Sequence, residues 1–204
     1  MKSCKNLYCH TFALTALVAI LSGQSARASL IIDVTQSGSD VVATASGSID
    51  LTGMTADFST TGEGAAWGTF PGGGSLIGVG PTTTASLEAY EAITGPAIFG
   101  SGAEVLASSG SGDLVAIAPG FAPGVIYVPA AYVSGAALSG TSTWDSTTIT
   151  ALGLTPGSYA YEWGNGADAD SLTLNIGVAP EPASAWLLAI GLIGLAFNRL
   201  RKRA

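Results

Sequence analysis

The stretch that decides the fold of this 204-residue chain is Leu154-Thr-Pro-Gly-Ser-Tyr-Ala-Tyr-Glu-Trp163-Gly-Asn-Gly-Ala-Asp-Ala-Asp170-Ser-Leu-Thr-Leu-Asn-Ile176. Aromatic side chains stand at every second position from Tyr159 to Trp163, and aliphatic ones at every second position from Leu172 to Ile176. Such alternation is typical of strands with one buried face. Pro156-Gly157 predicts a type II turn before the first strand, and Asn165-Gly166 predicts a tight turn between the two. The stretch therefore reads as an amphipathic β-hairpin.

Similar alternation continues outward from this hairpin through residues 29–178. A second hairpin is expected where residues 30–35 and 41–44 flank the turn residues 36–39. Further strands are predicted at 113–118, 125–128 and 147–152, and the only helical spacing is at 85–93. Seven to ten short strands separated by turn residues favour a mainly β fold, an antiparallel β-sandwich or a jelly-roll-like body.

Charge divides the chain into three parts. The seven basic residues lie at the two ends: Lys2, Lys5, Arg27, Arg199, Arg201, Lys202 and Arg203. Thirteen of the fourteen acidic residues lie in residues 29–178, which gives this segment a formal charge of −13 against −7 for the whole chain. A polyanion of this kind repels nucleic acid and anionic lipid headgroups, so neither is expected as a partner of this segment.

Residues 1–28 have the three parts of a secretory signal peptide. Lys2 and Lys5 precede an apolar core at 12–21, and Ala26 and Ala28 provide the small residues of a cleavage site after Ala28. The alternative, an uncleaved membrane helix, is disfavoured because ten residues span about 15 Å of a hydrocarbon core roughly 30 Å thick. The secretory translocon and signal peptidase are therefore expected partners. Cleavage would also remove the two cysteines and the histidine, since Cys4, Cys9 and His10 all lie in this segment.

Residues 29–178 contain no His, Cys, Lys or Arg. This composition excludes Ser-His-Asp and Cys-His catalysis, Schiff-base lysines, phosphate clamps and His-ligated zinc within the segment. We therefore expect no enzyme, with no catalytic residue and no cofactor.

The alternative is a carbohydrate-binding or carboxylate-dependent glycan-hydrolysing module. Its candidate ligand residues are Trp144 and Trp163, which could stack on a sugar, with the nearby carboxylates Asp168 and Asp170. Asn165, Asp168 and Asp170 also have the spacing of some calcium loops. Ala167 and Ala169 offer no ligands, however, so a structural turn is favoured and no metal site is predicted.

The C-terminal residues 179–204 combine three features. Pro180-Glu181-Pro182 is followed by an uncharged run at 183–197 and by the basic cluster Arg199, Arg201, Lys202 and Arg203. The run of fifteen residues extends about 22 Å as a helix, which is short for a bilayer. By the positive-inside rule the cluster stays in the cytoplasm, so the acidic body lies outside it. We expect a transmembrane helix here.

This combination resembles the PEP-CTERM sorting signal. The resemblance implies an exosortase, a membrane-embedded Cys protease or transpeptidase of Gram-negative bacteria, that cuts near Pro180, Glu181 and Pro182. It also implies a cell-surface or extracellular-matrix protein associated with exopolysaccharide, anchored in the inner membrane with its body in the periplasm before processing. An ordinary C-terminal membrane tail is the remaining alternative, whereas a glycolipid-anchor signal should not end in basic residues.

Overall fold

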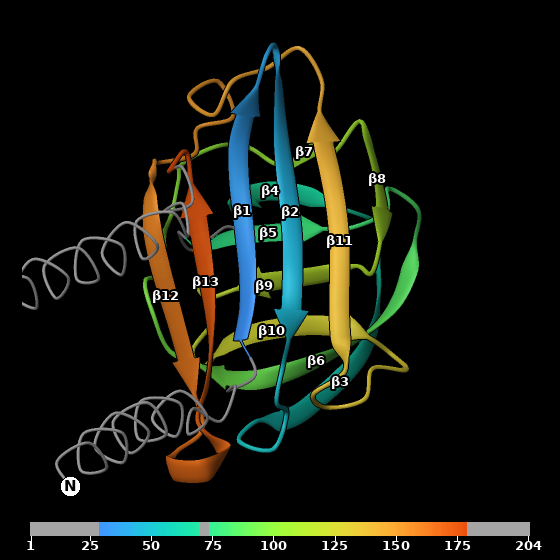
Figure 1. Ribbon diagram of the computed structural model, residues 1–204, viewed down its shortest axis with the longest axis vertical. Helices are drawn as coiled ribbons and strands as arrows, with labels where there is room; N and C mark the ends of the chain where they lie inside the picture. Colours follow the sequence, from blue (N-terminus) through green and yellow to red (C-terminus); the bar gives the residue numbers. More distant parts are fainter. Residues whose placement is uncertain (1–28, 70–73, 179–204) are drawn as a thin grey trace, which may run out of the picture.

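The computed structural model describes residues 29–69 and 74–178, which form two β-sheets. The sheet in front in Figure 1, here the front sheet, has the order β12 (Gly157–Trp163), β13 (Asp170–Ile176), β1 (Ser29–Ser37), β2 (Asp40–Ser48), β11 (Ala137–Trp144), β8 (Ser109–Gly112). The rear sheet has the order β3 (Thr55–Gly62), β6 (Ala85–Ile93), β10 (Gly124–Pro129), β9 (Val115–Ala118), β5 (Ser75–Val79), β4 (Ala66–Thr69), β7 (Val105–Leu106).

The mainly β prediction is confirmed, and the sheets face each other as in a sandwich. The front strands follow the long axis, whereas the rear strands run across them (Figure 1), as in orthogonally packed sheets. The strictly antiparallel prediction is wrong, because the first and last strands, β1 and β13, pair in parallel. The two sheets have six and seven strands, more in total than the seven to ten expected. Their strand order also differs from the two Greek keys of a jelly roll.

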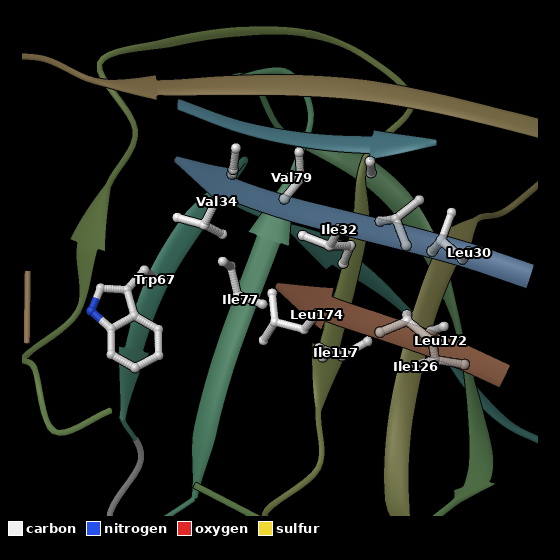
Figure 2. Packing of buried hydrophobic residues seen from close by; sticks show 14 of the residues in the cluster. Leu30, Ile32, Val34, Trp67, Ile77, Val79, Ile117, Ile126, Leu172 and Leu174 are labelled. Atoms are coloured by element: carbon white, nitrogen blue, oxygen red, sulfur yellow. The ribbon is translucent and has the colours of Figure 1, made fainter. Parts of the chain in front are cut away.

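The core lies between the two sheets. Leu30, Ile32 and Val34 of β1 are fully buried, as are Leu172 and Leu174 of β13. Figure 2 shows them facing aliphatic side chains of the rear sheet, among them Ile77, Ile117 and Ile126. Fully burying one such side chain stabilises the fold by about 1.5–3 kcal/mol. Because side chains alternate along a strand, the same register turns the polar residues outward.

Both predicted hairpins form. In the first, β1 pairs with β2 up to Ser37 and Asp40, with the turn at the predicted place. In the second, β12 pairs with β13 from Gly157↔Ile176 to Trp163↔Asp170.

The turns of the second hairpin differ from the prediction. Gly157 is the first residue of β12 and is not among the described residues with positive φ, so no type II turn forms there. Residues 164–169, which include the 3₁₀ turn η1 (Gly166–Asp168), replace the tight turn. A tertiary contact explains the longer connection, because a Cβ on Gly53 would lie 2.5 Å from the Cα of Gly164.

The helix predicted at 85–93 is wrong, because these residues form β6 between β3 and β10. Ala92 is an extra residue in the ladder, since Glu91 pairs with Val125 and Ile93 with Gly124. This bulge shifts the phase of the alternation, so that Tyr90 and Ile93 share one face at a spacing of three residues, as they would on a helix.

The strand predicted at 147–152 is also wrong, because the segment forms consecutive turns. Leu152 donates its amide hydrogen to the Thr148 carbonyl, and the Thr148 hydroxyl accepts the amide hydrogen of Ala151. The remaining predicted strands correspond to β9 and β10.

The predicted signal peptide and C-terminal helix lie outside the described residues. Within the two described ranges, no helix has the length and apolarity needed to cross a membrane.

Candidate functional site

The outer face of the rear sheet contains a groove, and the path of the chain explains it. Residues 63–65 connect β3 to β4, although four other strands separate these two in the sheet order. So short a connection requires the sheet to curl until the two strands approach each other. The resulting cavity of about 280 Å³, here the rear groove, is lined from every rear strand or its adjoining loop: Thr60, Gly62, Glu63, Gly64, Ala66, Leu76, Gly78, Leu87, Glu104, Leu106, Leu114, Ala116 and Tyr127.

Small residues make room in the middle of the groove. Gly78 pairs with Ala116, which in turn pairs with Tyr127, so the three lie in one row on the same face. The atoms nearest to a Cβ on Gly78 would be the Ala116 Cβ at 3.4 Å and two backbone atoms of residues 65 and 66 at 3.6–3.8 Å, all ordinary packing distances. The room therefore comes from missing side chains, while leucines form the walls.

Two carboxylates lie at the groove without a partner. Glu63 and Glu104 are exposed, and neither forms an ion pair or a side-chain hydrogen bond with any other described residue. No Lys, Arg or His exists in residues 29–178 that could pair with them. Any complementary positive side-chain charge must therefore come from outside this segment.

Aromatic rings adjoin the groove. Phe58 is 48% exposed and meets Tyr127 edge to face, with ring centroids 6.4 Å apart and an interplanar angle of 72°. Phe58 and Asp57 lie in a β-bulge, because β3 has two residues between the pairs Ala56↔Tyr90 and Ser59↔Glu88 where β6 has one. Burial raises the pKa of the Tyr127 hydroxyl, and the negative charge of Asp57 raises it further.

The two tryptophans predicted as sugar platforms are core residues. Trp144 and Trp163 are only 2% and 4% exposed. Their indole nitrogens donate hydrogen bonds to the carbonyls of Val105 and Asp50, at 3.1 and 2.8 Å. Neither ring offers a face to a ligand, so the structure does not support this prediction.

The two carboxylates predicted with them, Asp168 and Asp170, differ in their exposure to solvent. Asp168 is exposed in η1, whereas Asp170 is 5% exposed and accepts hydrogen bonds from the amides of Asp50 and Ser171, both at 2.7 Å. Burial raises the pKa of Asp170, and these two hydrogen bonds oppose the rise. Among residues 29–69 and 74–178, no cluster of three or more His, Cys, Asp or Glu could hold a metal.

No pattern in the sequence predicts the rear groove. Gly78 lies in β5, which was not predicted, and Glu63 and Glu104 look like any solvated carboxylates. The only available signal was the outward series of small residues at 66, 78 and 116, and it has meaning only once strand order is known.

The last strand leads directly to the C-terminal segment. Ile176 ends β13 opposite Val34, and the amide of Gly177 donates to the Val34 carbonyl at 2.8 Å. A family model described as the PEP-CTERM protein-sorting motif matches residues 178–202. The chain carries a PEP-CTERM sorting motif.

The PEP-CTERM match includes Pro180, Glu181 and Pro182 and extends to Lys202, so that Arg203 follows it. It supports export, a C-terminal sorting signal for the cell surface and exosortase as the processing partner. Neither a curated protein nor a solved structure shows a significant match to the chain. The PEP-CTERM motif therefore describes how the protein is sorted and leaves the role of the β body open.

Proposed function

We propose that the protein is a non-enzymatic component of the cell surface or extracellular matrix, associated with exopolysaccharide and sorted by exosortase. The observation that carries this proposal is the PEP-CTERM match, which begins two residues after the last strand ends. Before processing, the C-terminal helix anchors the chain in the inner membrane with the body in the periplasm. Cleavage near Pro180, Glu181 and Pro182 then releases the body to the surface.

The chemistry of the body supports a non-enzymatic role. Without His, Cys, Lys or Arg, residues 29–178 would depend on carboxylates for acid–base chemistry. Asp170, the most buried carboxylate, already accepts two backbone hydrogen bonds inside the fold. We therefore assign it a structural role.

Replacing Pro180, Glu181 and Pro182 by alanine tests the sorting step. In a strain that has exosortase, the wild-type body is expected to lose its C-terminal helix and leave the membrane fraction, whereas the variant keeps its full mass. Mass spectrometry of membrane and surface fractions distinguishes the two forms. A wild-type chain that keeps its C-terminal helix in that strain would overturn the proposal. Ser184→Ala, outside the tripeptide, serves as the matched control.

A further inference from the structure

We propose that the rear groove binds a Lys- or Arg-bearing peptide segment of another protein. The aliphatic part of the basic side chain would lie on the apolar surface of the groove, and its cationic head would meet Glu63 and Glu104. This inference concerns the β body alone and is independent of the sorting proposed above.

The shape and polarity of the groove fit an amphipathic side chain. Lys and Arg place methylene groups on apolar surfaces while the charged head stays near water. The groove provides both surroundings, since Leu76, Leu87 and Leu106 form apolar walls and the two glutamates are exposed. A purely apolar ligand would leave the glutamates unpaired, and a free metal ion would not use the leucines.

Charge favours a basic partner over any other. The body has a formal charge of −13 and no base of its own, so its field attracts cations from a distance. Glu63 and Glu104 keep their full hydrogen-bonding capacity, because no described residue occupies them. A charged partner can therefore replace water at both carboxylates without breaking an internal contact.

The aromatic pair adds a third favourable contact. A cation over the face of an aromatic ring, within about 6 Å of its centroid, is attracted by the ring, with guanidinium more frequent than ammonium. The β-bulge at Asp57 and Phe58 sets the Phe58 ring against Tyr127, which lines the groove. Phe58 is 48% exposed, so a bound cation can reach this aromatic pair from solvent.

Fluorescence anisotropy with the full-length chain in phosphatidylcholine nanodiscs tests the proposal. The probe is a short labelled peptide of alternating leucine and lysine, compared with the same peptide carrying glutamate for lysine. We expect binding of the lysine peptide alone, and binding that weakens as NaCl is raised from about 0.02 to 0.3 M, because salt screens exposed charges.

Two variants test the charge and the shape of the groove separately. Glu63→Gln with Glu104→Gln keeps shape and removes charge, and should weaken binding about tenfold. Gly78→Val keeps charge and fills the groove, and should weaken binding at least as much. The matched control, Asp145→Asn with Glu162→Gln, removes two exposed charges on the front sheet or the loop beside it and should leave binding within about twofold.

Each contrary result overturns the proposal. Equal losses in the control variant would mean that the peptide binds the whole polyanion without using the groove. Unchanged binding in Gly78→Val, with an unchanged melting temperature, would exclude the groove as the site. Binding of a neutral oligosaccharide, or self-association detected by sedimentation, that disappears in both groove variants would assign the groove to a sugar or to a second copy instead.

Discussion

Ala92 has a backbone conformation that L residues with a Cβ rarely adopt. Its φ is 122°, in the region where glycine is favoured, and it is the extra residue of the bulge between β6 and β10. Holding a non-glycine residue there costs about 1–3 kcal/mol, which the pairing of the surrounding strands must offset.

Ala92→Gly should therefore raise the free energy of unfolding by about 1 kcal/mol, since relief of strain exceeds the entropy that glycine loses on folding. Urea denaturation of the full-length chain measures the change. Ala89→Gly is the control, because Ala89 lies in the same strand, is 1% exposed and has no positive φ. Equal destabilisation by both substitutions would show that Ala92 is not strained.

Asp170 links stability to pH through a buried carboxylate. Its pKa is raised above the ordinary value of 3.8 by burial, and the nearby charge of Asp50 adds to the rise. The pKa of Asp50 is lowered, chiefly by hydrogen bonds from the Thr52 hydroxyl and amide. A raised pKa means that the folded state binds the proton more tightly than the unfolded state does.

The stabilising contribution of Asp170 is therefore complete below pH 3.8 and is lost as the pH rises through the folded-state pKa. The stability of wild type relative to Asp170→Asn should be more favourable at pH 3.5 than at pH 7. Urea titrations of both proteins at the two pH values measure this difference, in which the other carboxylates largely cancel. A relative stability that rises with pH would mean that the two amide hydrogen bonds outweigh burial.

At the scale of elements, the Gln36 side chain joins the first hairpin to the turns at 147–152. Its amide nitrogen donates to the carbonyls of Asp40 and Thr147, both at 3.0 Å, and its oxygen accepts the amide hydrogen of Ile149 at 3.2 Å. The exposed side chain thus fixes a segment that has no strand partner of its own.

Gln36→Ala should lower the free energy of unfolding by about 1–2 kcal/mol, since several hydrogen bonds of about 1 kcal/mol are replaced by bonds to water. Hydrogen exchange at the Ile149 amide should speed up more than exchange at the core strand β13. Gln36→Glu keeps an acceptor for Ile149 and should retain more of its protection. Equal protection in wild type and Gln36→Ala would show that Gln36 does not hold the turns.

The sequence predicts elements well where alternation is regular and local. Both hairpins, at β1–β2 and β12–β13, were recognised because apolar side chains stand at every second position without interruption. Prediction was wrong at β6, where the Ala92 bulge breaks the two-residue alternation. It was also wrong at 147–152, where Ile149 and Leu152 are buried although they lie in turns. Alternation identifies which residues are buried more reliably than it identifies the backbone conformation that buries them.

The groove and the parallel pairing of β1 with β13 could not be predicted in this way. Both depend on which strands become neighbours, and a strand's own residues do not specify its neighbour. Trp144 and Trp163 show the same limit, because an aromatic side chain beside a carboxylate fits a core position and a sugar site equally well. Only the strand order placed their indoles inside the fold.

At the scale of the whole molecule, the described body lacks any internal compensation for its charge. Thirteen carboxylates and no basic residue occupy residues 29–178, so the folded state concentrates negative charge that the unfolded chain spreads out. Hydrogen bonds stabilise some carboxylates locally, as at Asp50, which accepts them from hydroxyl and amide donors. Mobile cations must supply the remaining compensation.

Raising NaCl from about 0.02 to 0.5 M should therefore raise the melting temperature, because the Debye length falls from roughly 20 Å to a few Å and repulsion is screened. A gain of about 1–2 kcal/mol corresponds to roughly 3–6 °C for a domain of this size. Replacing exposed carboxylates tests the cause: Asp145→Asn, Glu162→Gln and Asp168→Asn together should raise the melting temperature at low salt and reduce its response to salt. An equal salt response in the triple variant would assign the effect to general salting-out, which acts on apolar surface regardless of charge.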